Sequence, residues 1–321
     1  MRRFYIALIP LTLTSCIGTN DAEDRVVSQK YIHKYGFELD KKEWVARDRD
    51  GKIEQFLANG VRVVKTYQNG DLQGETTYTY PYSATIERSY IYEQDELIQE
   101  TIHDRRGVPI EQKHYNTEDE KTITFWGYSG APLRLERYQK GLLTEGTYYN
   151  TRNAVESTVK HGEGRRYKRA RNGALMAIDD ISSGVLEQRT TYHPNGNIHV
   201  ISRFEDYALS GVQKIHDPSG QLYMTNDWEN GAIHGKKIAY RKGQVLQETP
   251  YQFGKREGVE KRFDDQGALV AEVEFHEDEK HGPATLYNAG DGVKKAWFYK
   301  GKPIQAERFH MLTSKEDVAQ D

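Results

Sequence analysis

The chain of 321 residues contains a single cysteine, Cys16, so no disulfide can form within it and its stability must come from strand pairing. Hydrophobic residues make up only 36% of the sequence and the mean hydropathy is −0.84, which disfavours a large globular core. Beyond the N-terminus, no apolar run approaches the roughly 20 residues that a membrane-spanning helix needs. These shortages exclude a disulfide-stapled domain and a helical membrane protein.

Aromatic residues, in contrast, are abundant. The chain has 22 Tyr, 10 Phe and 4 Trp, and its charge is nearly balanced at 45 basic and 48 acidic residues. Disordered chains are poor in aromatics, so a largely disordered chain is disfavoured. Many aromatics with few aliphatics are typical of a thin, repetitive β structure whose core is a strip.

The first sixteen residues have the organisation of a targeting signal. Arg2 and Arg3 precede a short apolar run over residues 4–13, and Leu13-Thr14-Ser15-Cys16 resembles the lipobox of bacterial lipoproteins. We therefore expect residues 1–15 to be a signal peptide and Cys16 to carry a lipid such as palmitate. The chain would then be exported and membrane-anchored, at the outer membrane or facing the periplasm rather than the cytoplasm. The alternative is an ordinary signal peptide in which Cys16 falls by chance.

The rest of the chain is organised by a repeat. The motif aromatic-x-Asn-Gly-x-x-x-Gly occurs at Trp228–Gly235 and again at Tyr67–Gly74. Large side chains follow turn residues at a spacing of eight, and Thr151 to Val159 keeps that spacing without the usual residue types. Eleven units with a period of about 23 residues are predicted. Their turn positions are Gly60, Ala84, Gly107, Gly130, Thr151, Gly173, Gly196, Gly220, Gly243, Gly267 and Gly290.

Each unit is predicted to be a β-hairpin. Residues 269–275 alternate apolar and polar side chains with a period of two, and Asp264 and Gly267 mark the turn before them. Eleven such hairpins predict an all-β fold, an elongated, twisted, single-layer antiparallel meander. Aromatics that recur at one position are expected to stack across strands as ladders. A one-layer sheet is expected to offer no enclosed pocket for catalysis.

Four segments follow from this pattern. Residues 1–15 form the signal peptide and residues 16–43 the lipidated cysteine, a tether and an N-terminal cap. Residues 44–305 form the repeat array. Residues 306–321 are either a frayed tail or a short capping helix. Exposed sheet edges at the ends of such an array could pair between copies into a homo-oligomer.

The repeats resemble the MORN repeat, and most closely the bacterial variant in antitoxin-like proteins, which alternates with a Pro-Asn-Gly turn as in His193-Pro-Asn-Gly196. The resemblance is best over residues 192–301. It implies an extended hairpin array that scaffolds, binds proteins or binds phospholipids, and it implies no reaction. The sequence departs from the pattern at Thr151, Asp206-Tyr207 and Phe275–Asp278, where altered turns are expected. The repeat turn glycines, expected to have a structural role, are Gly70, Gly74, Gly196, Gly211, Gly220, Gly231, Gly235, Gly258, Gly267 and Gly282.

One run of basic residues stands out as a candidate contact for an anionic surface, namely Arg165, Arg166, Lys168, Arg169 and Arg171. The alternative is a solvated strand and turn, because Lys and Arg protect exposed sheet edges. His234 and His281 precede repeat glycines, and the chain contains no HExxH or CxxC motif, so no metal site is predicted. With no nucleophile elbow or P-loop, we predict neither a catalytic residue nor a cofactor.

Two functions remain open. The first is a membrane-anchored, non-enzymatic β-repeat scaffold that binds a protein in the cell envelope. The alternative is a module that contacts lipid or glycan through the basic run. A nucleic-acid partner is not expected for an exported protein.

Overall fold

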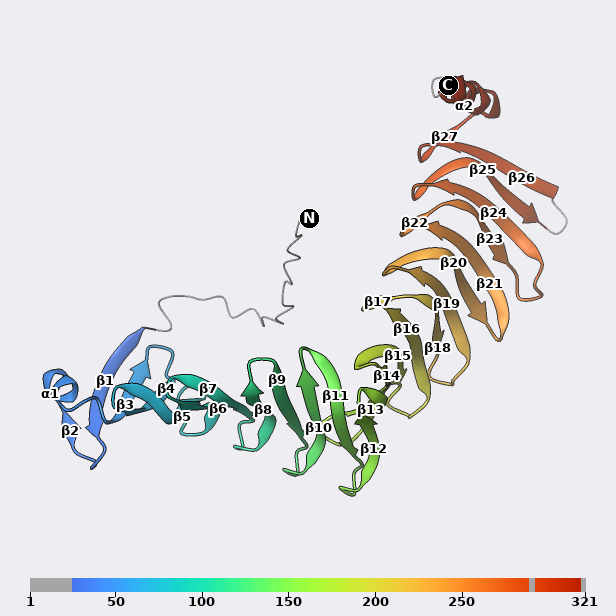
Figure 1. Cartoon of the computed structure of the whole chain (residues 1–321). Coiled ribbons are helices and arrows are strands. Elements are labelled where there is room, and N and C mark those ends of the chain that lie inside the picture. Colours follow the sequence, from blue (N-terminus) through green and yellow to red (C-terminus); the bar gives the residue numbers. More distant parts are fainter. Residues whose placement is uncertain (1–24, 289–291, 319–321) are drawn as a thin grey trace, which may run out of the picture. The chain divides into compact units, whose positions relative to one another are not determined.

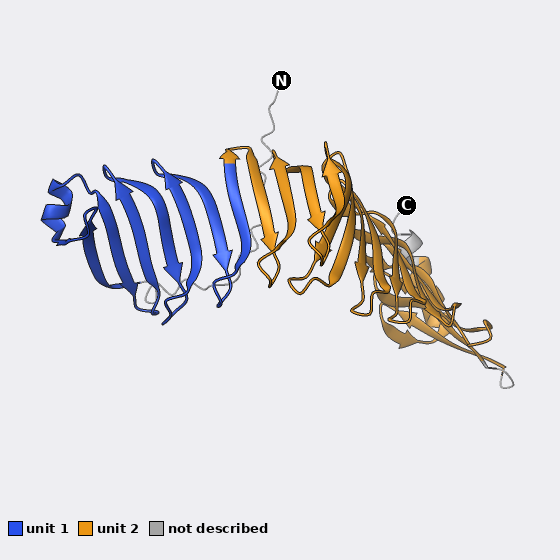
Figure 2. Cartoon of the chain, turned by 90° about the horizontal axis from the view of Figure 1, so that it is seen from below, with its two compact units in different colours: residues 1–115 blue, residues 116–321 orange. Residues whose placement is uncertain are grey.

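A computed structural model describes residues 25–288 and 292–318 of the chain. The described residues form 27 strands and two helices (Figure 1). They belong to two compact units, residues 1–115 and residues 116–321, which Figure 2 colours separately. The predicted signal peptide, Cys16 and the last predicted turn position, Gly290, lie outside the described residues.

Unit 1 begins the sheet and carries one helix. Its strands are β1 (Val26–His33), β2 (Glu38–Leu39), β3 (Gly51–Leu57), β4 (Arg62–Gln68), β5 (Asp71–Thr79), β6 (Ile86–Glu93), β7 (Glu96–His103) and β8 (Pro109–Thr117), which ends just past the unit boundary, and its helix is α1 (Lys41–Ala46).

Unit 2 holds the remaining strands and the second helix. They are β9 (Glu120–Trp126), β10 (Pro132–Gln139), β11 (Leu142–Tyr149), β12 (Val155–Lys160), β13 (Glu163–Arg169), β14 (Leu175–Ser182), β15 (Val185–Tyr192), β16 (Ile198–Glu205), β17 (Ala208–Leu209), β18 (Gly211–His216), β19 (Leu222–Glu229), β20 (Ala232–Arg241), β21 (Gln244–Gln252), β22 (Lys255–Arg256), β23 (Gly258–Phe263), β24 (Leu269–His276), β25 (Glu279–Asn288), β26 (Gly292–Tyr299), β27 (Lys302–Ile304) and α2 (Ala306–Val318).

The strands form an open antiparallel meander, which confirms the predicted all-β fold of tandem hairpins. Within unit 2, for example, β24 pairs with β23 on one side and with β25 on the other, both antiparallel. The turns before these strands follow the predicted chemistry. Asp264 accepts hydrogen bonds from the backbone of Gln266 and Ala268, and Gly267 has a φ of 83°.

Two-residue tips close the other side of the hairpins, with positive φ at both positions. Asn230 and Gly231 have φ values of 49° and 80°, as type I′ turns require. The expectation of an altered turn at Asp206-Tyr207 is wrong, because these residues adopt the same conformation with φ values of 47° and 66°. The pairings on either side of the tip supply the free energy that holds Tyr207 in a region unfavourable to side chains.

The recurring aromatics of unit 2 share one face and one row of the sheet. Each faces a glycine on the preceding strand: Trp228 pairs with Gly211, Tyr251 with Gly235, and Phe275 with Gly258. Successive aromatics are therefore two strands apart, about 9.5 Å, which exceeds the separation of contacting rings. The expectation that they stack on one another is wrong for these residues.

Cations occupy the space between the aromatics of this row. The guanidinium of Arg256 lies 4.1 Å from the ring centroid of Phe275, and the ammonium of Lys280 lies 4.9 Å from that of Phe298. In this row, a ring on one strand therefore faces a glycine or a cation on the next strand. Cation–π attraction adds to the stability that strand pairing provides.

Strand β12 marks an irregular unit. It has 6 residues, whereas β10, β14 and β19 each have 8. The turn before it places Asn153, with a φ of 58°, where other units have a glycine. The eight-residue spacing to Val159 predicted Thr151 at this position, and that assignment is wrong, because the strand of this unit is shorter while its turn is kept.

Because β12 is short, the units before and after it touch one another. At one end of the strands the Tyr128 amide donates to the Arg171 carbonyl at 3.0 Å, and at the other the Leu143 amide donates to the Gly184 carbonyl at 3.0 Å. The sheet curls around this point and encloses a small core, contrary to the expectation of a sheet with no enclosed interior. The core residues are Leu143, Tyr148, Val159 and Ile181, each at most 4% exposed.

Both ends of the sheet carry a helix. Asp40 caps α1 by accepting hydrogen bonds from the amides of Lys42 and Glu43, and α1 buries Trp44 against Tyr31 and Tyr67. The sheet therefore begins at Val26, earlier than the predicted array start, and Trp44 belongs to the cap. At the C-terminal end α2 packs Phe309 against Trp297 of β26, so the predicted alternative of a capping helix applies.

Candidate functional site

The face of the unit 2 sheet that carries Trp228, Tyr251 and Phe275 is here called the ladder face. Beside the aromatic row it carries a second row, in which polar side chains face one another directly across the strands. Gln213 donates to Ser202 at 2.9 Å, and Asn226 donates to Gln213 at 3.0 Å. Farther along, Thr249 donates to Glu260 at 3.1 Å. Cross-strand hydrogen bonds of this kind satisfy polar groups that the neighbouring rings half bury.

Asp179 of β14 is the most deeply buried charge in this row, with no exposed side-chain surface. Arg166 of β13 donates to it through Nη2 at 2.7 Å and Nε at 2.9 Å. Arg189 of β15 donates to it from the other side at 2.7 and 3.0 Å. The ammonium of Lys168 lies 3.4 Å from the same carboxylate. Burial alone would raise the pKa of Asp179, but these three cations outweigh it and hold the pKa below its usual range.

A second buried carboxylate, Glu136 of β10, lies next to this group. The hydroxyl of Tyr138 donates to Glu136 Oε2 at 2.8 Å, and Arg166 Nη1 lies 3.4 Å from that hydroxyl oxygen. Arg134 Nε lies 3.4 Å from Glu136 Oε1, and the Arg134 guanidinium stacks 3.6 Å from the ring centroid of Phe125. The curl around β12 brings β10 next to β13 and so joins the two carboxylates into one cluster.

Positive charge exceeds negative charge in this cluster. Its cations are Arg134, Arg166, Lys168 and Arg189, called the cation cluster below, and its anions are Glu136 and Asp179, so four positive charges face two negative ones. Burial lowers the pKa of Lys168 to about 8, and repulsion from Arg166, Arg189 and Arg134 adds to the shift despite the attraction of Asp179. Burying charge without a counter-charge lowers the stability of a fold. A cluster with only a structural role would therefore be expected to have balanced charges.

Polar atoms without hydrogen bonds lie in the same place. Among the described residues, the buried hydroxyl of Tyr148 forms no hydrogen bond, and the Nε of Arg134 and Oε1 of Glu136 have only their mutual ion pair at 3.4 Å. Tyr148 and Glu136 are 0% and 2% exposed. Burial, with the neighbouring charge of Glu136 second, raises the pKa of Tyr148, which therefore stays a neutral hydroxyl.

The predicted basic run divides between the two faces of the sheet. Arg166 and Lys168 project into the cluster, whereas Arg165 pairs with Asp180 at 3.1 Å on the reverse face. Arg169 forms two hydrogen bonds of 2.8 Å with Glu156. The guanidinium of Arg171 lies 4.5 Å from the ring centroid of Tyr128. The run is therefore a set of separate pairings rather than one continuous basic patch.

Sequence reasoning missed Arg134, Arg189, Asp179 and Glu136. A signal for two pairs was present. Arg166 and Arg189 are one repeat period apart and so occupy the same position in successive hairpins, and Glu136 and Asp179 each lie six residues after a predicted turn glycine, Gly130 and Gly173. The meeting of Arg134 and Glu136 with the other cations could not be predicted, because it depends on the curl at β12.

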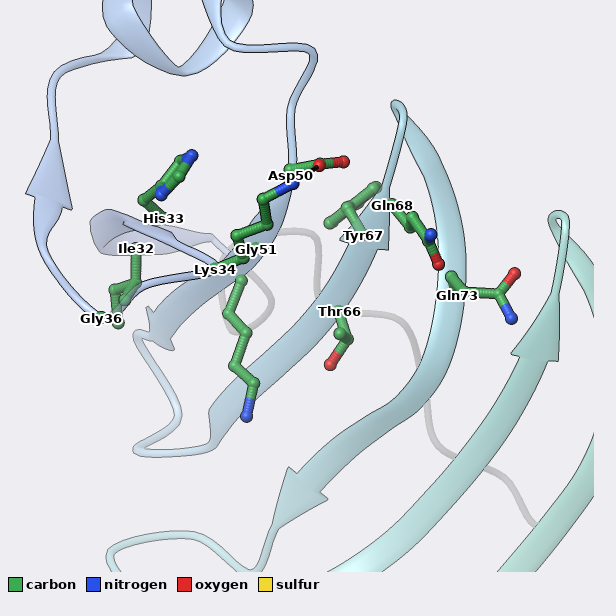
Figure 3. Close-up of a pocket in the computed structure, with 11 residues that line it drawn as sticks. Ile32, His33, Lys34, Gly36, Asp50, Gly51, Thr66, Tyr67, Gln68 and Gln73 are labelled. Carbon is green, nitrogen blue, oxygen red and sulfur yellow. Dashed lines mark hydrogen bonds and ion pairs between the residues drawn. The ribbon is translucent and has the colours of Figure 1, made fainter.

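Unit 1 contains a cavity of about 510 Å³ near its first strands (Figure 3). Its lining comes from β1, β3, β4 and β5 and includes Lys34, Asp50, Tyr67, Gln68 and Gln73. Lys34 donates to Asp50 at 2.7 Å, and the Asn69 amide donates to the other carboxylate oxygen at 2.5 Å. The Lys34 hydrogen bond, followed by the Asn69 amide, lowers the pKa of Asp50. The charges of Lys34 and Asp50 neutralise each other, which leaves Lys52 as the other charged residue of the lining. The cavity has the size of a ligand site but no cluster of like charges to direct a ligand.

Two further features concern metals and membranes. Within residues 25–288 and 292–318, no three or more His, Cys, Asp or Glu side chains are grouped so that they could hold a metal ion. In the same part of the chain, neither helix has the length and apolar character needed to cross a membrane.

No family model and no curated protein sequence matches the chain. Among solved structures, one match is the crystal structure of TcdB2-TccC3-Cdc42, with 10% identity and a TM-score of 0.19 over 76% of this chain. The chain spans only 19% of the length of that protein. A second match is a porin-like protein from Bacteroides uniformis, with 13% identity and a TM-score of 0.17, covering 83% of this chain and 92% of that one. Likenesses this weak carry no argument about function.

Proposed function

We propose that the protein is an exported lipoprotein, anchored through a lipid on Cys16, whose β-repeat sheet binds a partner protein in the cell envelope. The N-terminal sequence supports the anchor, because a charged start, a short apolar run and the Leu-Thr-Ser-Cys motif follow in order. The open sheet supports the scaffold, because it is not closed into a barrel and exposes side chains at hairpin tips of its described part, such as Tyr207 and Phe253.

The observation that carries the protein-binding proposal is the exposure of aromatic side chains at two hairpin tips of unit 2. Tyr207, at the tip between β16 and β17, is 79% exposed, and Phe253, at the tip between β21 and β22, is 73% exposed. A tip needs only positive φ and does not require a large ring. The Phe253 ring contacts the His234 ring, with 4.8 Å between centroids, yet most of its surface faces water. Exposed aromatics are, however, the residues that most often anchor protein interfaces.

The alternative, contact with a lipid or glycan surface through the basic run, has weaker support. Arg165 and Arg169 are each paired with a carboxylate of the same sheet, which leaves little net charge for a flat anionic surface. Pairing between copies is also disfavoured at the described C-terminal end, because the edge strand β27 has 3 residues, includes Pro303 and is followed by α2.

Two experiments test the proposal. Radiolabelled palmitate should be incorporated into the wild-type chain and be absent from Cys16→Ala, and label that persists in the variant would contradict the anchor. A photo-crosslinking amino acid at Tyr207 or Phe253 should capture a discrete protein from intact cells. The control is the same group at Met176, which is 56% exposed on a strand rather than at a tip. Equal yields at all three positions would contradict recognition by the tips.

A further inference from the structure

The cation cluster of unit 2 has a property that the scaffold function does not require. Elsewhere in the polar row, neighbouring groups are matched as donor with acceptor, as in Gln213 with Ser202, or as one cation with one anion, as in Arg262 with Glu260. Around Asp179 and Glu136 the balance is four against two. A half-buried excess of two positive charges destabilises a fold unless a further anion neutralises it.

Access to the cluster is graded. The side chains of Lys168 and Arg189 are 30% and 32% exposed, while Arg134 and Arg166 behind them are 15% and 13% exposed. Lys168 and Arg189 can therefore meet a ligand from solvent. The buried cations Arg134 and Arg166 also attract the ligand, and their charges are less screened because little water reaches them.

The cluster is also rigidly held. Arg166 and Arg189 are fixed by two hydrogen bonds each to Asp179, and Arg134 is fixed by the Phe125 ring. Guanidinium groups held in place lose little side-chain freedom on binding and present planar donor pairs that match phosphate and carboxylate geometry. The buried hydroxyl of Tyr148 has no well-formed hydrogen bond, and Nε of Arg134 has only the 3.4 Å ion pair with Glu136 Oε1, so both donors are incompletely satisfied within the cluster.

We propose that the cation cluster is a binding site for an oxyanion, the phosphate or carboxylate group of a ligand, which Lys168 and Arg189 contact directly and Arg134 and Arg166 attract from behind. The site lies on the ladder face and draws on β10, β13 and β15. It is distinct from the tips that we propose for protein binding and does not depend on them.

Binding of an anion at this site should depend on pH, because it is linked to the protonation of Lys168. Lys168 faces Arg166, Asp179, Arg189 and Arg134, and an added anion would favour its protonated form. Binding should therefore take up protons near pH 8 and should weaken as the pH rises above that value. A nonspecific effect of salt on surface charges has no such pH dependence.

Isothermal titration calorimetry of the purified full chain tests the proposal with inorganic phosphate and with acetate, at pH 7 and pH 9.5. Chloride at equal ionic strength serves as the reference. We expect saturable binding of at least one oxyanion, with an affinity at least about tenfold lower in Lys168→Met and in Arg189→Gln, since each removes a charged hydrogen bond. Binding of phosphate alone assigns a phosphate ligand, and binding of acetate alone assigns a carboxylate.

The matched control is Arg165→Gln, which removes an arginine of the same strand whose partner, Asp180, lies on the reverse face. Its affinity should stay within about twofold of the wild type. Absence of saturable binding by either oxyanion, or an equal loss in Arg165→Gln, would overturn the proposal. If a cluster variant does not fold, the melting temperature of the wild-type chain decides. It should rise with the oxyanion at pH 7 and less at pH 9.5, and a rise no larger than that with chloride would refute the site.

Discussion

Tyr148 folds its ring back over Gly146, two residues earlier on strand β11, so that a Cβ at Gly146 would collide with the tyrosine hydroxyl. Gly146 lies directly opposite Glu136 and Val159 on the neighbouring strands. The missing side chain is thus the space in which the core of the curled region is built. This glycine is needed for packing, because its φ is not in the left-handed region.

Gly146→Ala is therefore expected to destabilise the chain by about 1–3 kcal/mol through overpacking. The measurement is the urea midpoint of unfolding. In the double variant Gly146→Ala/Tyr148→Ala the added methyl group has room, so the two effects should not add. Additive losses would show that the contact between the two residues is not the cause.

Replacement of the buried carboxylate should be far more harmful than that of its neighbour. Asp179→Asn leaves Arg166, Lys168 and Arg189 without their shared counter-charge, with an expected loss of about 3–5 kcal/mol at pH 7. Asp180→Asn removes a partly exposed ion pair with Arg165 and keeps an acceptor for Gln188, so the expected loss is below about 1 kcal/mol. Similar losses in the two variants, measured by urea unfolding, would contradict the central place of Asp179.

The same carboxylate predicts an acid dependence of stability. The folded-state pKa of Asp179 lies below its value in the unfolded chain, so its contribution is present above the unfolded pKa of about 3.9. It is lost as the pH falls through the folded-state pKa. The unfolding free energy of wild type should therefore fall more steeply in acid than that of Asp179→Asn. Parallel curves for the two chains would contradict this assignment.

Lys168 predicts the opposite behaviour in base. Its pKa is about 8 in the folded chain against 10.5 ordinarily, so the penalty for its charge is fully present below pH 8 and is relieved as the pH rises toward 10.5. Relative to Lys168→Met, the wild type should gain stability between pH 8 and pH 10.5. The check is the difference in urea midpoint between the two chains at pH 7.5 and pH 10, and a difference that does not change with pH would refute it.

The ladder and the tips should respond differently to loss of an aromatic ring. Phe275 is 5% exposed and packs against Gly258 and Arg256, so Phe275→Ala should cost about 3–5 kcal/mol. Phe253 is 73% exposed at a tip, so Phe253→Ala should change stability by less than about 0.5 kcal/mol. Hydrogen exchange of the amides in β23 and β24 should accelerate only in Phe275→Ala. Acceleration in both variants would show that the tip ring is structural.

The sequence determined the repeat, its period and its hairpins, because turn chemistry and alternation act over a few neighbouring residues and recur in each unit. The rings at 251 and 275 were predicted at one position of the repeat, and the structure places them in one row. The prediction that Gly235 and Gly258 lie in turns is wrong, because both belong to strands and face these rings across the sheet. The repeat period could also have predicted that Arg166 and Arg189, which are one repeat apart, occupy equivalent positions.

Only the tertiary structure decided where the sheet curls and which residues of distant strands the curl brings into contact. The loss of residues from β12 looks in the sequence like a weak repeat, yet it lets Tyr128 reach Arg171 and carries Glu136 toward Arg166. The physical reason is that a strand's length is local, whereas the contacts made across a shortened strand depend on the twist and pairing of all its neighbours. The excess of positive charge around Asp179 exists only once those strands have met.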